Sequence, residues 1–172
     1  MKRKTLIKNC VLVALFSAVI SVSALVSIPI FSLVITMQTF SIFLALFLLG
    51  GKLGTFSVLL YVALGAIGLP VFSGFSGGVS RFFDPLGGFL FGFVFLAFTY
   101  WILNSLHIPR VISSILAHIV LYVSGLLWYI LIYEGDFVYA VCVLVLPFLL
   151  FDAIKLWLAF FVANRIKPKK CS

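Results

Sequence analysis

Long apolar stretches separated by short polar turns run along almost the whole chain. A helix needs about 20 apolar residues to cross the hydrocarbon core of a bilayer. The pattern predicts six transmembrane helices, at residues 6–28, 36–49, a third that ends near Leu69, 86–106, 111–133 and 137–166. The last stretch is long for a single span, so we expect it to be tilted or broken at Pro147.

Short connections leave no room for a second, soluble domain, so residues 1–172 are expected to form one domain. A loop is expected at residues 30–35, a glycine turn at 50–54, and the longest polar interruption at 71–85. The composition supports a lipid environment: 65% of the residues are hydrophobic and 9% are charged. Soluble domains carry about 45–50% apolar and about 25% charged residues. The predicted fold class is an all-α membrane protein, a compact bundle of six helices.

The positions of the charges predict the topology. The net charge is +8, but the basic residues gather in the two tails rather than along a nucleic-acid-binding face. With both termini cytoplasmic, ten of the twelve cations lie inside, including Lys52 and Arg110, as the positive-inside rule requires. Arg81 is then the one cation outside, and the acids Asp84, Glu134 and Asp136 share that side. The first apolar stretch exceeds the 7–15 residues of a signal-peptide core, so we expect a retained helix.

The sequence contains no motif that indicates an enzyme. The chain has no His-Glu-x-x-His zinc motif, Gly-x-Ser-x-Gly elbow or Walker motif. His118 is expected to be a packing residue and His107 a residue of a cytoplasmic turn. The three cysteines lack metal-ligand spacing, so neither a metal nor a cofactor is expected: Cys10, Cys142 and Cys171.

Two charged residues interrupt the last apolar stretch. Asp152 and Lys155 are spaced three apart, so they share one face of a helix and can form an ion pair. Each is costly at the centre of a bilayer, by about 2.5–3.5 kcal/mol on the insertion scale. The pair either neutralises itself and fixes packing, or faces a cavity where Lys155 binds an anionic group and Asp152 orients the lysine.

The glycine-rich segment 73–78 and Arg81 are a second candidate site. The segment is either a flexible connector or a lid that brings Arg81 over the same cavity. Ala14 and Ala18, four residues apart, give the first helix a small-residue face on which another helix could pack closely. Gly88 and Gly92 repeat that spacing, and for both pairs the alternative interpretation is generic helix packing.

Several motifs, in the same order along nearly the whole chain, resemble the BioY family. They are VITMQTF (34–40), LLGGKLG (48–54), LGAIGLPVF (64–72), SGG (76–78), PLGGF (85–89) and LPFLLFDAIK (146–155). The chain departs from the family pattern at Leu86 and Phe89, which replace a threonine and a tyrosine.

The resemblance implies a six-helix S component of an energy-coupling factor (ECF) transporter, which captures biotin from outside in the bacterial cell membrane. A transmembrane coupling subunit and two ATPase subunits would be its partners. Arg81, Asp152 and Lys155 would lie near the biotin carboxylate. The polar residues Thr36, Gln38, Ser76 and Gly77 would lie near the pocket. Ala14 and Ala18 would dock the transmembrane partner.

Two other functions share these features. An S component for another small vitamin would have the same topology. A self-sufficient carrier driven by an ion gradient could use Asp152 and Lys155 as a proton relay. A structural scaffold would leave these two residues and Arg81 unexplained.

Overall fold

Helices make up most of the computed structural model, which describes residues 2–30, 33–133 and 136–166. The elements in chain order are α1 (Lys2–Leu25), β1 (Ser27–Ile30), β2 (Leu33–Thr36), α2 (Gln38–Leu49), α3 (Gly51–Ala66), the 3-10 helix η1 (Val79–Phe83), α4 (Gly87–Ser105), α5 (Arg110–Tyr133), α6 (Phe137–Leu144) and α7 (Leu146–Ile166). Each predicted helix is present. Glu134, the cations of the C-terminal tail (Lys167, Lys169 and Lys170) and Cys171 lie outside the described residues.

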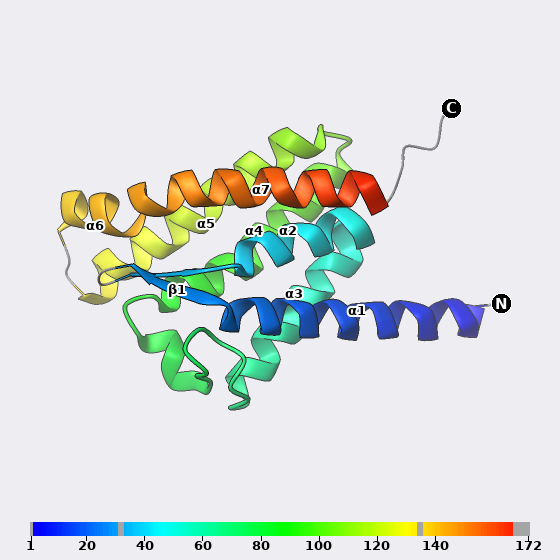
Figure 1. Ribbon diagram of the computed structural model, residues 1–172, viewed down its shortest axis with the longest axis horizontal. Helices are drawn as coiled ribbons and strands as arrows, with labels where there is room; N and C mark the ends of the chain where they lie inside the picture. The colour runs from blue at the N-terminus through cyan, green and yellow to red at the C-terminus, as the bar shows by residue number, and fades with distance from the viewer. Residues whose placement is uncertain (1, 31–32, 134–135, 167–172) are drawn as a thin grey trace.

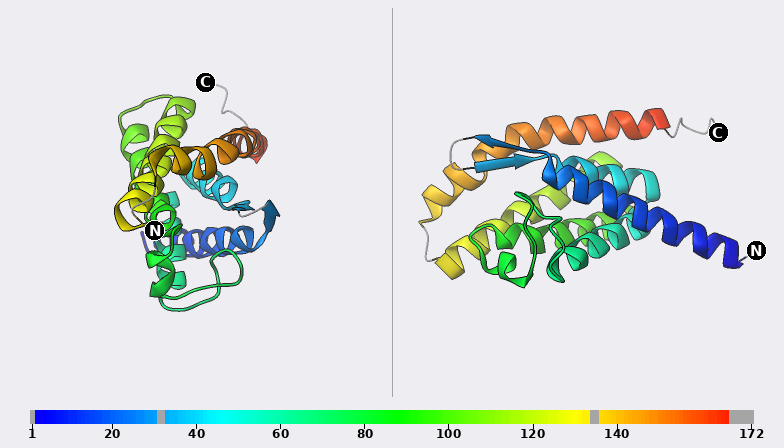
Figure 2. Two further views of the ribbon diagram at one scale, coloured as in Figure 1. Left: turned by 90° about the vertical axis from the view of Figure 1, so that its left-hand side faces the viewer. Right: turned by 60° about the horizontal axis from the view of Figure 1, so that its bottom comes forward.

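Four helical segments of the described chain are long and apolar enough to cross a membrane: Arg3–Leu25, Gly87–Ser105, Arg110–Tyr133 and Ala140–Ile166. The helices α2 and α3 are apolar but shorter, at 12 and 16 residues. The chain is thus a multi-pass membrane protein by composition and length, and the count of six crossings stays a prediction. The start of α1 and the end of α7 lie at the same end of the bundle (Figures 1 and 2), as an even number of crossings requires.

The centre of the bundle is α2. This helix packs against α1, α3, α4 and α7, and in Figure 1 it lies between α1 and α7. Its side chains Ile42, Phe43 and Leu46 are fully buried. A short helix enclosed on several sides contacts protein rather than lipid, which is why α2 can carry buried polar side chains at its first turn.

A β-hairpin replaces the loop expected at residues 30–35. Strands β1 and β2 pair antiparallel, with Ser27 opposite Thr36 and Ile28 opposite Ile35. The predicted end of the first helix near Ile28 was therefore wrong, since α1 ends at Leu25. Pro29 disfavours a helical conformation at the residue before it, and the β-branched residues that follow suit a strand.

The last helix is broken, one of the two expected alternatives, but two residues before Pro147. Val145 separates α6 from α7, and Pro147 lies in the first turn of α7. Pro147 has no N–H to donate to the preceding turn, so the helix cannot continue unchanged through it. The break lets α7 run beside α2, where it carries Asp152 and Lys155 into the bundle.

Glycines bring α4 and α5 into close contact. A Cβ atom at Gly88 would overlap Trp128 Cβ, and one at Gly92 would overlap Ser124 Oγ. On the opposite helix, a Cβ at Gly125 would meet the ring of Phe89. The small-residue spacing at Gly88 and Gly92 therefore serves helix packing within this chain, as the generic interpretation expected.

Candidate functional site

A buried ion pair lies on α7. Lys155 Nζ is 2.9 Å from Asp152 Oδ1, and the two residues are 6% and 4% exposed. Their i, i+3 spacing places both on the helix face that packs against the rest of the bundle. The sequence thus identified a charged pair that the structure confirms, enclosed among helices rather than facing lipid.

Two hydroxyl groups that the sequence analysis missed complete the surroundings of Asp152. Thr39 Oγ1 donates to Oδ1 over 2.9 Å, and Tyr122 Oη donates to Oδ2 over 2.8 Å. Thr39 is on α2 and Tyr122 is on α5, so three helices converge on one carboxylate. Because charged groups are costly to bury unless paired and hydrogen-bonded, these donors are what make the site tolerable.

His118 lies beside the same carboxylate. Its Nε2 is 3.3 Å from Asp152 Oδ2, within ion-pair distance, but the geometry does not make a hydrogen bond. The ring stacks on Phe43, with centroids 5.1 Å apart, and lies 5.3 Å from the ring of Tyr122. His118 is therefore a packing residue, as expected, and it also borders the polar cluster.

Gln38 forms a second buried polar group. Its Nε2 donates to Tyr61 Oη over 2.7 Å, and Thr36 Oγ1 donates to its Oε1 over 3.5 Å. Gln38 and Thr39 are neighbours in the first turn of α2, where one reaches α3 and the other reaches the ion pair on α7. The first turn of α2 thus links two polar groups within the bundle.

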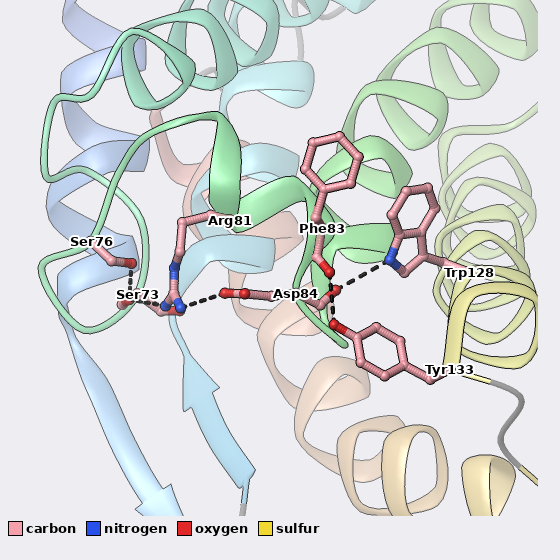
Figure 3. A network of polar contacts seen from close by, with 7 residues as sticks. All are labelled: Ser73, Ser76, Arg81, Phe83, Asp84, Trp128 and Tyr133. Atoms are coloured by element: carbon pink, nitrogen blue, oxygen red, sulfur yellow. Dashed lines mark hydrogen bonds and ion pairs between the residues drawn. The ribbon is translucent and has the colours of Figure 1, made fainter.

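The remaining cation of the predicted site, Arg81, has other partners. In η1 its Nη1 lies 2.6 Å from Asp84 Oδ2, and its Nη2 donates to the Ser73 carbonyl over 3.4 Å. Ser76 Oγ donates to the same carbonyl over 2.8 Å. Figure 3 shows Arg81 pointing toward Ser73 and Asp84. Among the described residues, the contacts of Arg81 stay within its own loop, and none joins it to Asp152 or Lys155.

Two aromatic residues of α5 attach this loop to the bundle (Figure 3). Trp128 Nε1 donates to the Asp84 carbonyl over 3.2 Å, and Tyr133 Oη donates to the Phe83 carbonyl over 2.7 Å. The preceding part of the loop contains the positive-φ residues Gly74, Phe75 and Gly78. The anchored end therefore holds Arg81 and Asp84, and glycine permits the sharp turns of the segment before it.

Replacing Tyr133 with phenylalanine is expected to loosen the anchored end of the loop. The variant removes one hydrogen bond to a backbone carbonyl, so amide hydrogen exchange at residues 79–86 should become several-fold faster. Tyr129→Phe is the matched control, because Tyr129 is on the same helix and contacts Tyr133 through its ring. Equal exchange rates in both variants would show that the hydroxyl of Tyr133 does not hold the loop.

Gly77 lies at the base of the same loop. A Cβ atom there would overlap the carbonyl oxygen of Leu69, in the turn that follows α3. The loop backbone at Gly77 therefore lies directly on this turn, where only glycine fits. Any residue with a side chain at position 77 would push the loop away from Leu69.

Ala14 and Ala18 are exposed on α1. Ala18 lines an open, mostly apolar hollow of about 270 Å³ together with Leu15, Val19, Val22 and Ser23. The small-residue face is thus available on the outside of the bundle, unlike the glycines of α4.

The described residues show no grouping of three or more His, Cys, Asp or Glu side chains that could hold a metal ion. Cys10 and Cys142 are free and exposed.

Apolar helices around a buried polar cluster define this chain as a multi-pass membrane protein with a polar site inside the bundle. It belongs to the BioY family, whose model matches residues 1–170. It is 38% identical to the probable biotin transporter BioY of Pyrococcus horikoshii, over 93% of this chain and 96% of that protein. It is also 38% identical to the biotin transporter BioY of Thermotoga maritima, over 89% of this chain and 92% of that protein.

A solved structure has the same fold. The crystal structure of the S-component for biotin from an ECF-type ABC transporter superposes with a TM-score of 0.87 at 29% identity. The match covers 98% of this chain and 95% of that one. The predicted family is therefore confirmed.

Proposed function

We propose that this chain is a biotin-binding S component of an ECF importer, which captures biotin from the outer side of the cell membrane. Relatives named as biotin transporters support the choice of ligand. The observation that carries the proposal is the buried Lys155: among the described residues its ion pair with Asp152 accounts for one of its three N–H donors, so the others are available to an anionic group of a ligand. Biotin supplies a single carboxylate on an apolar body, which suits a mainly apolar cavity with few polar groups.

Each residue of the site has a distinct role in this proposal. Lys155 binds the carboxylate of biotin, and Asp152 orients the lysine. Arg81 reaches the same carboxylate when the glycine-rich loop moves inward and Arg81 exchanges its partner Asp84 for the ligand. Gln38, Ser76 and Gly77 lie near the rest of the ligand.

Transport through the membrane would need further subunits. We propose that a transmembrane coupling subunit docks on the α1 face that contains Ala14 and Ala18, and that two ATPase subunits supply the energy. The exposure of this face and the open hollow beside Ala18 support that surface.

A titration of the purified protein with biotin and with other small vitamins tests the function. Biotin should bind at submicromolar concentration and should not be displaced by the other vitamins. Preference for another vitamin would identify a different S component. Uptake by the lone chain in proteoliposomes, abolished by a protonophore, would instead support the ion-coupled carrier with Asp152 and Lys155 as its relay.

Substituting Ala18 with tryptophan is expected to separate capture from transport. The large side chain fills the hollow on α1 and prevents a second helix from approaching closely. Biotin binding by the purified chain should stay within about twofold of wild type, whereas co-purification with the coupling subunit should be lost. Ile119→Trp is the control, since Ile119 is 51% exposed but lies on α5, away from the α1 face. Normal assembly of Ala18→Trp would exclude this docking face.

A further inference from the structure

Neutral hydroxyl groups hold the Asp152 carboxylate on both sides. Thr39 donates to Oδ1 and Tyr122 donates to Oδ2, over 2.9 and 2.8 Å. An aspartate carboxylate turns easily about its last side-chain bond, because this torsion has only a broad preference. One donor on each oxygen removes that freedom and fixes the plane of the carboxylate.

The orientation of Lys155 depends on that plane. Its Nζ bonds to Oδ1, the oxygen that also accepts from Thr39. An ammonium group has three N–H donors, and among the described residues Asp152 accounts for one of them. A fixed carboxylate therefore fixes the directions in which the other donors of Lys155 are available.

The two hydroxyl groups come from different helices, and each lies next to residues that have buried contacts of their own. Thr39 follows Gln38 in the first turn of α2, where Gln38 is bonded to Tyr61. The Tyr122 ring lies against His118, which stacks in turn on Phe43. These contacts hold both donors in place before any ligand arrives, so the cluster is preorganised rather than assembled on binding.

We propose that Thr39 and Tyr122 are positioning residues of the ligand site, which align Lys155 through Asp152 and so set the preference for a carboxylate over a neutral group. This inference rests on the proposed function. Neither residue needs to touch the ligand. Their effect is expected in the discrimination between charged and neutral ligands rather than in the overall shape of the pocket.

The test compares biotin with biotin amide, which has the same body and no carboxylate. Tyr122→Phe removes one hydroxyl and should weaken biotin about tenfold, while the amide changes less than about threefold. Tyr129→Phe makes the same chemical change on the same helix and should leave both affinities unaltered. Thr39→Val should act like Tyr122→Phe, and Thr39→Ser, which keeps the hydroxyl, should restore the wild-type ratio.

The outcomes distinguish a failure of the proposed function from a failure of the positioning role alone. Binding of biotin by the wild-type protein decides the proposed function, and its absence would overturn the function and this inference together. If the wild type binds but both ligands weaken equally in Tyr122→Phe and Thr39→Val, the hydroxyl groups only support packing and the inference alone is overturned. Should one variant fail to fold, the other still supplies the ratio.

Discussion

Replacing Lys155 with methionine is expected to abolish biotin binding at micromolar ligand and to lower the free energy of unfolding by about 3–5 kcal/mol. Methionine keeps most of the length of the side chain but removes the charge. Asp152, only 4% exposed, then stays among apolar helices without its cationic partner. The measurements are isothermal titration with biotin and with biotin amide, and unfolding of the detergent-solubilised protein.

A double variant separates the two effects of Lys155→Met. Adding Asp152→Asn removes the uncompensated charge. The Oδ1 of asparagine can still accept from one of the two hydroxyl groups, and its Nδ2 can donate to the oxygen of the other. The double variant should regain most of the lost stability and still fail to bind biotin. Biotin binding by either variant at wild-type affinity, or equal losses for biotin and its amide, would show that Lys155 does not bind the carboxylate.

Replacing Gly88 with alanine should destabilise the bundle by about 3 kcal/mol, at the upper end of the usual cost of overpacking. The added Cβ overlaps Trp128 Cβ and also lies 2.9 Å from the Ser124 carbonyl oxygen. Both of these atoms lie on or next to the backbone of α5, so neither can turn away as the end of a long side chain could. The helices α4 and α5 would have to separate, and Trp128 would also lose its position at the loop.

A substitution that can be compensated provides the control. At Gly92 an added Cβ overlaps Ser124 Oγ and approaches Leu121 Cδ1. Ser124→Ala removes that oxygen, so it should restore part of the stability lost in Gly92→Ala, but it should not rescue Gly88→Ala. Thermal unfolding in detergent measures the stability of Gly88→Ala and Gly92→Ala, each alone and combined with Ser124→Ala, relative to wild type. A Gly88→Ala variant as stable as wild type would show that α4 and α5 are farther apart than described.

Apolar length and charge spacing predicted much of this structure. The positions of α4 and α5 follow from uninterrupted apolar runs, and the break between α6 and α7, just before Pro147, follows from the missing N–H of this proline. The hairpin at residues 27–36 was missed because its three isoleucines and its valine are as apolar as the helix before them. Apolar runs of β-branched residues do not separate a strand from the end of a membrane helix.

The site was predictable only where it carried charge. Asp152 and Lys155 stand out because charges are rare in apolar helices, and their spacing already shows that they can pair. Thr39 is 113 residues away from Asp152 in the chain, and a single threonine in an apolar helix gives no indication of its partner. Tyr122 was missed for the same reason. The pairing of Arg81 with Asp84 follows from the short turn of η1, which the sequence showed only as a polar interruption.

Native mass spectrometry of the protein, purified from cells grown with biotin, tests the central claim most directly. The account predicts a complex with one bound molecule of the mass of biotin, and loss of this complex in Lys155→Met while the variant remains folded. Wild-type protein that carries a different small molecule, or that shows no adduct after addition of micromolar biotin, would contradict the assignment of biotin as the ligand.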